Sequence, residues 1–192
     1  MAELRDSGNR REFESGAVRD MQEGKGRCDL LPLKECGFIL NYEFDDIELN
    51  GSIIDDIDLI MSEIFNISYS DSEEFSEYIL KITYKKIYKK LIGTAAIFIN
   101  QQMFHPVDED WTYEMRATTA ILELAKHFED GAKKYGDNNW RKGIPITVFL
   151  DSAIRHYLKF RRNDQDEPHA RAFLWNLICC AWTLDNIGFI ER

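Results

Sequence analysis

The stretch that decides the fold is ELAKHFEDGAKKYGDNNWRKG, residues 123–143, and two later segments continue its pattern. FLDSAIRHYLKF covers residues 149–160, and DEPHARAFLWN covers residues 166–176. These three segments hold three of the four histidines of the chain, several carboxylates and an Asn-Asn-Trp turn. Apolar residues recur in them with the period of an amphipathic helix, so we predict an all-α helical bundle that carries a polar site.

The periodicity of the whole chain predicts five helices. They cover about residues 52–65, 72–91, 114–134 and 148–162, and the last one opens at the DEPH segment. Ser52 and Thr147 are the expected caps of the first and fourth of these helices, and Asp166 or Glu167 of the last. Gly93 is expected to break the second helix before another apolar piece.

Helical phase also sorts the polar residues of the helix predicted over 114–134. Glu129 lies on the shoulder of the apolar stripe, about 80° from its centre, where a carboxylate reaches a cleft between helices. Glu123, His127 and Asp130 are expected on the solvated face.

The 192 residues divide by composition into four segments. We expect a flexible N-terminus (1–10), a basic glycine-containing segment (11–36), an acidic helical insertion (37–113), and a helical core (114–192) that forms one domain with the basic segment. An extended, ordered glycine-rich loop is predicted within the basic segment, and a short hairpin or extended stretch over residues 37–51.

The net charge of −10 is unevenly distributed. Residues 35–80 contain 13 acidic residues and no Lys or Arg, so the other 21 acidic residues stand against all 24 basic ones. This balance disfavours binding to a nucleic-acid backbone, but it allows a local basic pocket for a small phosphate ligand.

The cysteines and the N-terminus indicate the compartment. Cys28, Cys36, Cys179 and Cys180 lack the paired spacing of zinc ligands and are predicted to be reduced structural thiols. The chain begins with a polar stretch, so we expect neither a signal peptide nor a membrane span, and we predict a cytoplasmic protein.

The segment from Arg11 to Leu33 combines glycines with positive charge. Its glycines allow backbone N–H groups to approach an anion, and Arg19, Lys25 and Arg27 would neutralise that anion. The segment has no Walker pattern, and a flexible basic arm is the alternative interpretation.

Several separated motifs carry a resemblance to a known family. GAVRD and GKGR near the N-terminus, EDGAKKYGDNNWRKG, the Arg-His pair at 155–156, and DEPHARAFLWN occur in the order of the phage-encoded family of the dATP/dGTP diphosphohydrolase N-terminal domain. The resemblance covers about residues 11–33 and 121–180. Two features depart from it: some eighty residues intervene between these parts, and Ala172 stands where a second histidine is expected.

The resemblance implies hydrolysis of purine deoxynucleoside triphosphates, dATP or dGTP, to the monophosphate and pyrophosphate. It is similar in kind to the all-α NTP pyrophosphohydrolases, which hold Mg²⁺ between carboxylates of neighbouring helices. We therefore expect Glu129, Asp151 and Asp166 to hold Mg²⁺ or Mn²⁺, which prefer oxygen ligands and bridge phosphates.

Other residues are assigned to catalysis and substrate binding. Lys134 and Arg155 are expected to stabilise the transition state together with the basic N-terminal residues, and His156 or His169 to orient water or to serve as a ligand. The predicted contacts to base or sugar are Asn139, Trp140 and Asn176.

Two other functions remain open at this stage. The same residues suit a phage nucleotide-binding protein that sequesters a nucleotide or a nucleotide-derived immune signal without hydrolysing it. The acidic insertion suits an interaction module with a basic partner. By analogy with the helical pyrophosphohydrolases we expect a homo-oligomer, located in the host cytoplasm if phage-encoded, with a purine nucleotide and neither nucleic acid nor membrane as its partner.

Overall fold

The computed structural model describes residues 10–21, 23–44, 52–69, 77–101 and 110–188, and this part of the chain is mainly helical. The helices are α1 (Leu33–Leu40), α2 (Ile53–Tyr69), α3 (Glu77–Asn100), α4 (Tyr113–Tyr135), α5 (Ile146–Arg161) and α6 (His169–Asn186). Two 3-10 turns, η1 (Cys28–Leu30) and η3 (Asn139–Lys142), and one antiparallel hairpin, β1 (Arg10–Glu12) with β2 (Val18–Asp20), complete the described elements. The prediction of an all-α fold is confirmed.

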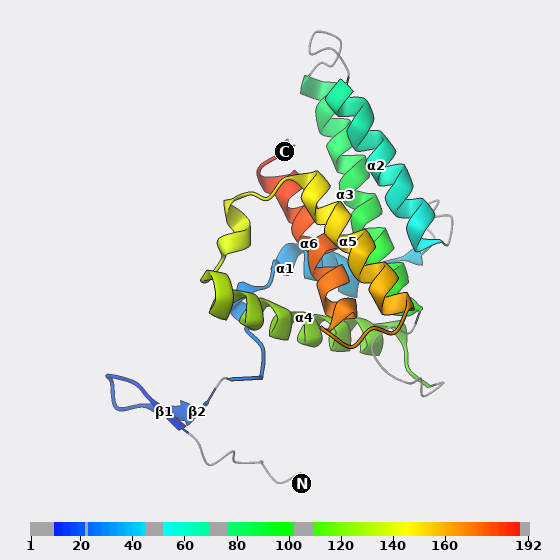
Figure 1. Ribbon diagram of the computed structural model, residues 1–192. Helices are drawn as coiled ribbons and strands as arrows, with labels where there is room; N and C mark the ends of the chain where they lie inside the picture. The colour runs from blue at the N-terminus through cyan, green and yellow to red at the C-terminus, as the bar shows by residue number, and fades with distance from the viewer. Residues whose placement is uncertain (1–9, 22, 45–51, 70–76, 102–109, 189–192) are drawn as a thin grey trace.

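Helix α6 lies at the centre of the bundle, with α3, α4 and α5 packed around it (Figure 1). Its sequence has apolar residues on nearly every side, and the helix is buried over most of its length. A helix of this kind is stable only when neighbours cover it all round. Phe98 of α3 is one such neighbour, and its ring centroid lies 4.4 Å from that of Phe173.

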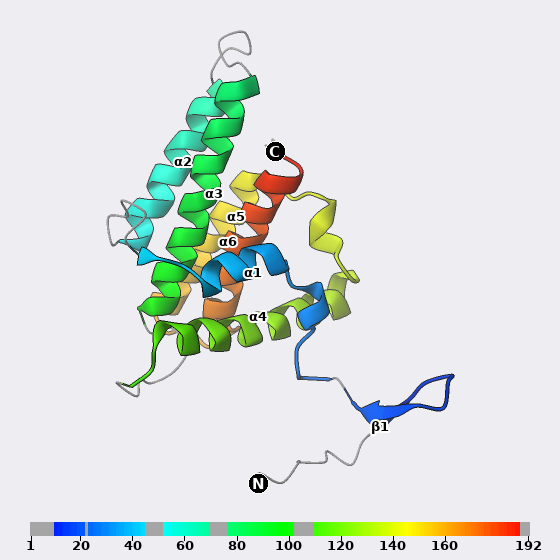
Figure 2. The same cartoon turned by 180° about the vertical axis from the view of Figure 1, so that it is seen from behind.

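Helices α2 and α3 form a long antiparallel pair that extends beyond the other helices (Figure 2). The pair buries Ile53, Ile57, Ile60 and Ile64 of α2, and the Ser52 hydroxyl accepts a hydrogen bond from the Asp55 N–H, as the predicted cap requires. The core is continuous from α3 to α6, so much of the segment predicted as an insertion packs into the same core as the remainder of the bundle.

The structure corrects the expected break at Gly93. Helix α3 continues through this glycine to Asn100, and residues 91–96 are all buried. A glycine inside a helix costs about 1 kcal/mol relative to alanine, which the burial of neighbouring apolar side chains readily offsets.

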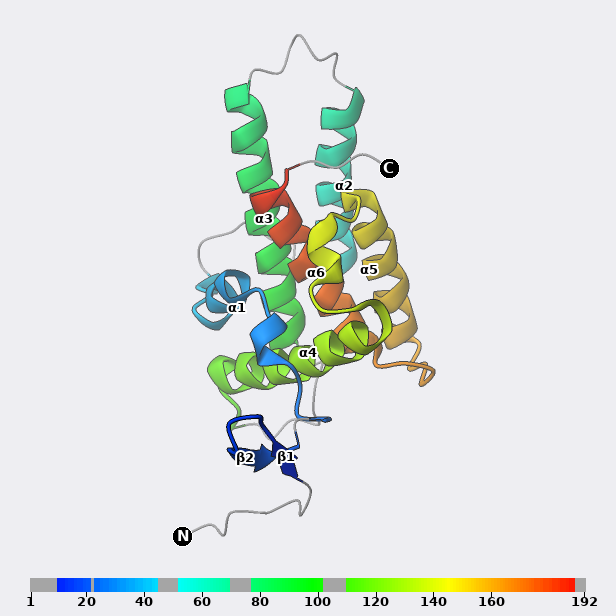
Figure 3. The same ribbon diagram turned by 90° about the vertical axis from the view of Figure 1, so that its left-hand side faces the viewer.

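The predicted hairpin or extended stretch over residues 37–51 is wrong in its described part, because residues 33–40 form α1; residues 45–51 lie outside the described residues. A hairpin occurs instead in the basic segment, where Gly16 (φ +78°) makes the turn. Residues 10–19 are exposed, and the hairpin lies apart from the helices, below α4 (Figures 1 and 3).

Helix ends follow the expected chemistry in α4 but not in α5 and α6. Thr112 caps the start of α4, and Gly136 (φ +87°) ends it. The N-caps of α5 and α6 are Pro145 and Pro168, in place of the predicted Thr147 and Asp166 or Glu167. The fixed φ of proline suits a position at the start of a helix.

All four cysteines are free, and Cys36, Cys179 and Cys180 are buried in the core. Burial raises the pKa of the Cys36 thiol to about 12, which keeps it protonated. These three therefore act as structural thiols, as predicted. Among the described residues, no helix combines the length and the apolar character needed to cross a membrane.

Truncation of Phe98 tests whether α3 belongs to the central core. We expect Phe98→Ala to lower the free energy of unfolding by about 3–5 kcal/mol, because it leaves a cavity beside Phe173. Phe65→Ala, at a phenylalanine of α2 that is 45% exposed, should cost far less. Urea unfolding measures both; equal losses would contradict a shared core.

Candidate functional site

Two buried histidines meet where α5 ends and α6 begins. The two helices are antiparallel and joined by residues 162–168, so His156 near the end of α5 lies beside His169 at the start of α6 (Figure 1). Their Nδ1 atoms are 3.1 Å apart. The two residues are only 8% and 3% exposed, and buried imidazoles require polar partners.

The loop between the helices supplies those partners. The Glu167 Oε1 atom lies 3.3 Å from Nδ1 of His156 and 3.6 Å from Nδ1 of His169. Asp166 Oδ1 lies 2.8 Å from the other ring nitrogen of His169, Nε2. Lys159 of α5 holds the second oxygen of Asp166 at 2.6 Å. His169 thus has His156 and Glu167 next to its Nδ1 atom and Asp166 next to its Nε2 atom.

Each ring nitrogen of His169 has a polar partner. Asp166 Oδ1 is an acceptor for an Nε2–H group, and the Nδ1 atom of His169 faces Nδ1 of His156. Lys159 and then His169 lower the pKa of Asp166 to about 2, which keeps it ionised as the acceptor. Burial lowers the pKa of His156, and nearby Glu167 opposes that shift. The Nδ1 atoms of the two imidazoles thus face each other beside the Glu167 carboxylate.

His127 joins this region from α4 and is not on a solvated face as predicted. It is half-buried, and its ring centroid lies 5.9 Å from that of Trp175 in α6. Burial lowers the pKa of His127 to about 4, with Arg171 and His156 acting in the same direction and Glu167 in the opposite one. His127 thus lies within electrostatic reach of His156.

A cavity of about 330 Å³ opens next to His169. Its lining includes Glu123, Glu167, Pro168, His169 and Arg171. The Arg171 guanidinium lies 3.4 Å from the Glu123 carboxylate, so one wall carries both charge signs. We call His156, His169 and Glu167 the histidine cluster. Two of its members, His169 and Glu167, line this cavity, which a small polar ligand can enter.

Glu129 has a different position from the one predicted for a ligand in a cleft. It is buried, and its two carboxylate oxygens accept the N–H groups of Gly24 (3.0 Å) and Gly26 (2.9 Å). Lys133 lies 3.0 Å from the same carboxylate. The Gly24 N–H, Lys133 and the Gly26 N–H all lower the pKa of Glu129, which burial alone would raise. Glu129 thus fixes the glycine loop to α4.

Gly26 is required where the loop meets α4. A Cβ at this position would lie 2.9 Å from the backbone nitrogen of Lys126 and 3.0 Å from Ala125, and φ is +87°. Arg27 continues the contact, since its N–H donates to the carbonyl of Ala125 at 3.0 Å. Only glycine permits this close backbone approach.

Asp151, the second of the three carboxylates predicted as metal ligands, is exposed on α5. In the described residues, two groups of ligand atoms lie within 4.8 Å of one another: His156, Glu167 and His169, and Asp164, Asp166 and His169. Asp166 is in the second group, whereas Glu129 and Asp151 are in neither. A cation shared by Glu129, Asp151 and Asp166 stays a prediction, and the ligand atoms that converge here are different.

The predicted basic residues are spread over the surface. Arg155 donates to the Ser152 hydroxyl at 3.0 Å, and it lies close enough to His156 to lower the pKa of that residue. Tyr135 raises the pKa of Lys134, and Glu167 adds a smaller electrostatic contribution, so Lys134 lies within reach of the cluster. Arg19 lies on the exposed hairpin.

Lys25 lies in the glycine loop that Glu129 binds, and Arg27 directly follows this loop. Lys25 is exposed, between the two glycines that Glu129 binds. Arg27 binds Asp29 (2.7 Å) and Asp137 (2.9 Å), and both carboxylates raise its pKa. Arg27 therefore links the N-terminal segment to the residues that follow α4.

The residues predicted to hold base or sugar have structural contacts. Trp140 is 5% exposed and packs between Phe128 and Trp182, with ring centroids at 5.5 and 4.8 Å. The Asn176 side chain is buried and donates to the carbonyl of Ala172 at 2.8 Å. The side-chain oxygen of Asn139 accepts from Lys142 at 3.1 Å. Their assignment to the nucleotide stays a prediction.

Part of the chain matches the model of a known family. Residues 108–190 match the model of the family described as dATP/dGTP diphosphohydrolase, N-terminal. The match contains α4, α5 and α6 with the whole histidine cluster, and it confirms the resemblance stated for residues 121–180. No curated protein and no solved structure matches the chain.

The sequence predicted His156, His169 and Asp166 as site residues. It did not predict that Glu167 and His127 lie next to them. Glu167 precedes His169 by only two residues, and the segment Asp166–His169 concentrates charge at a helix start, which was a usable signal. The position of His127 depends on how α4 crosses α6, which helical phase within one element does not reveal.

The clamp at Glu129 predicts a pH-dependent docking of the glycine loop. At pH 7 we expect Glu129→Gln to lower the free energy of loop opening by about 2 kcal/mol, because an amide has one acceptor oxygen for two N–H donors. The pKa of Glu129 in the folded chain is below its usual value of 4.5, so the difference should shrink as the pH falls through 4.5 and below.

Hydrogen exchange of the Gly24 and Gly26 amides measures this opening. Asp130→Asn, which changes the exposed neighbouring carboxylate, is the matched control and should leave the exchange nearly unchanged. Equal protection in wild type and Glu129→Gln at pH 7 would rule out the clamp.

Proposed function

We propose that the protein hydrolyses purine deoxynucleoside triphosphates to the monophosphate and pyrophosphate, with a divalent cation held at the histidine cluster. The observation that carries the proposal is the convergence of His156, His169 and Glu167 beside a cavity, within the region that matches a diphosphohydrolase family. The dATP and dGTP of the family description give the substrate class.

The distances within the cluster fit a single cation. Nδ1 of His156, Nδ1 of His169 and Oε1 of Glu167 form a triangle with edges of 3.1, 3.3 and 3.6 Å. Ligands bound at about 2.1 Å on neighbouring coordination positions are about 3.0–3.4 Å apart. The triangle therefore supports two imidazoles and one carboxylate on one face of an ion.

The chemistry of the donors favours some ions over others. Imidazole suits first-row transition metals, whereas Mg²⁺ prefers an all-oxygen shell and keeps several waters. Of the two cations expected from the sequence, Mn²⁺ fits the set with two histidines better than Mg²⁺ does. The Asp166–His169 contact supports the same assignment, because ligand imidazoles usually donate their second N–H to a carboxylate.

The other residues of the site suit a triphosphate. When bound, the cation would supply electrostatic stabilisation of phosphoryl oxygens. Lys134 and Arg155 would offset the charge of the substrate from α4 and α5, and Arg171 would do so from the wall of the cavity. Lys159 holds Asp166, which in turn fixes the orientation of the His169 ring.

Loss of Glu167 tests the catalytic proposal. We expect Glu167→Gln to reduce monophosphate release from dATP or dGTP at least about 100-fold, because the amide removes the charge from the cluster. Glu114→Gln, at an exposed carboxylate in the first turn of α4, should have wild-type activity. No release above the Glu167→Gln background, with either Mn²⁺ or Mg²⁺, would refute the proposal.

Asp151→Asn distinguishes the two ligand sets in the same assay. The cluster at His156, His169 and Glu167 does not include Asp151, so the variant should retain most of its activity. A loss as large as that of Glu167→Gln would favour the carboxylate trio predicted from the sequence.

Binding of the cation can be measured without substrate. A ligand at 100 times its Kd stabilises the folded chain by about 2.7 kcal/mol, so Mn²⁺ should raise the Tm of the wild type by several degrees. His156→Asn should lose most of this increase whatever its own Tm, and Glu114→Gln should keep it. An equal increase in all three proteins would place the bound ion elsewhere.

A further inference from the structure

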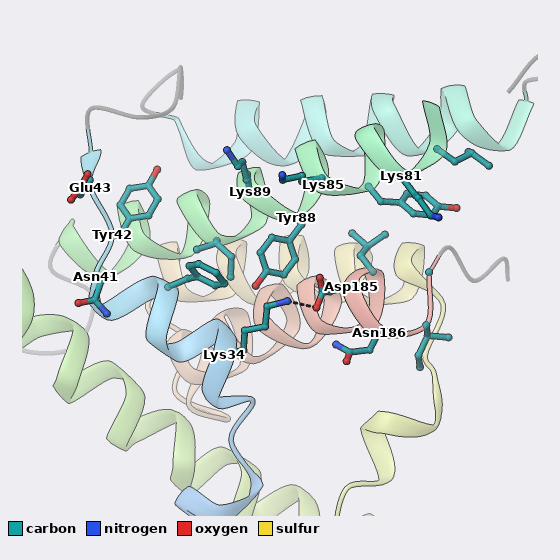
Figure 4. A pocket seen from close by; sticks show the side chains of 17 residues that line it. Lys34, Asn41, Tyr42, Glu43, Lys81, Lys85, Tyr88, Lys89, Asp185 and Asn186 are labelled. Carbon is teal, nitrogen blue, oxygen red and sulfur yellow. Dashed lines mark hydrogen bonds and ion pairs between the residues drawn. The ribbon is translucent and has the colours of Figure 1, made fainter. Parts of the chain in front are cut away.

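A second and larger hollow lies at the other end of the bundle, between α1, α3 and the end of α6 (Figure 4). Its volume is about 1030 Å³, which is at the upper end of the range of small-ligand sites. We call it the α3 groove. Its lining contains four lysines and three tyrosines: Lys34, Lys81, Lys85, Lys89, Tyr42, Tyr84 and Tyr88.

The side chains of α3 that line the α3 groove form two rows. Tyr84 and Tyr88 lie one turn apart on one flank, and Lys85 and Lys89 lie one turn apart on the other, about 60° and 100° round the helix from Tyr88. Figure 4 shows Lys85 and Lys89 toward α2 and Tyr88 turned toward α1 and α6. Positive charge and aromatic surface therefore run side by side for about one and a half turns.

The charge of the α3 groove is opposite to that of the chain as a whole. Among the described residues that line it, the carboxylates are Glu43 and Asp185, and Asp185 is already paired with Lys34. This excess of positive charge is local, because the net charge of the protein is −10. A groove of this kind attracts an anion against the overall potential of the molecule.

Two other lysines of α3, Lys86 and Lys90, do not line the α3 groove. Lys86 and Lys90 face α2, where both contact Glu63 Oε1 at 2.9 Å. They share one carboxylate and do not line the α3 groove, whereas Lys85 and Lys89 do.

We propose that the α3 groove binds a nucleoside polyphosphate, with its phosphates on Lys85 and Lys89 and its base against Tyr84 and Tyr88. Lysine is a point donor for phosphate oxygens, and successive lysines on one helix face are about 6 Å apart, a span that a triphosphate covers. Tyrosine rings offer the base a sequence-tolerant stacking surface. The site is separate from the histidine cluster and does not depend on a cation or on hydrolysis.

Calorimetric titration in EDTA tests the proposal with α,β-methylene dATP and dGTP as ligands. EDTA removes divalent cations but leaves lysine–phosphate contacts intact. We expect Lys85→Ala/Lys89→Ala to weaken binding at least about tenfold, because the variant removes both lysines that contact the phosphates. Lys86→Ala removes one charge from a lysine of the same helix that contacts Glu63 and does not line the groove, so it should change the affinity less than about twofold.

Two further ligands separate the contributions of phosphate and base. Inorganic tripolyphosphate should bind the wild type about tenfold more weakly than the nucleotide analogues, and Tyr84→Leu should remove most of that difference. Thermal unfolding checks that each variant is folded. Absence of binding by the wild type in EDTA, or unchanged binding by Lys85→Ala/Lys89→Ala, overturns the site; equal affinity for tripolyphosphate overturns its nucleoside specificity.

The outcome is independent of the enzyme assay. Failure of the α3 groove leaves the Glu167-dependent release of monophosphate untouched. Failure of hydrolysis leaves binding in EDTA to be measured on its own.

Discussion

The structure depends on the burial of α6. Phe173 packs against Phe98 of α3 and Tyr157 of α5, and Trp175 packs against Phe128 of α4, so all three helices must contact α6 before its apolar surface is covered. Removal of α3, α4 or α5 would expose part of α6 to water. This requirement explains why α3 packs into the central core although an acidic segment precedes it, and it fixes which ends of α4 and α5 come together.

The histidine cluster follows from the same packing. Coverage of α6 by α5 in an antiparallel arrangement buries His156 against His169, and two buried imidazoles are tolerated only with polar partners. Asp166 and Glu167 provide them from the connecting loop. The cost of burying these groups is offset within a few residues of sequence, which makes the site compact and leaves it at the edge of the core, where a ligand has access.

Local chemistry was predictable from the sequence, whereas contacts between distant elements were not. Helical periodicity located α2, α4, α5 and α6 and placed Glu129 on the shoulder of its helix. It did not show that the partners of Glu129 would be the amides of Gly24 and Gly26, because that contact joins residues more than a hundred positions apart. Gly93 misled the prediction for a related reason: intrinsic propensity is a weak signal when tertiary burial decides.

The two polar regions lie at opposite ends of α6, with His169 at its first turn and Asp185 near its last. Eighteen helical residues span about 27 Å, so a ligand at one end has no direct contact with the other. The two ends share one electrostatic property. An acidic chain repels an anionic ligand everywhere except where positive charge is concentrated, and the α3 groove and the basic side chains around the histidine cluster are such places. Because α6 is packed on every side along its length, a displacement of one end must be accommodated by the helices that cover it, and any coupling between the two regions would run through that shared core.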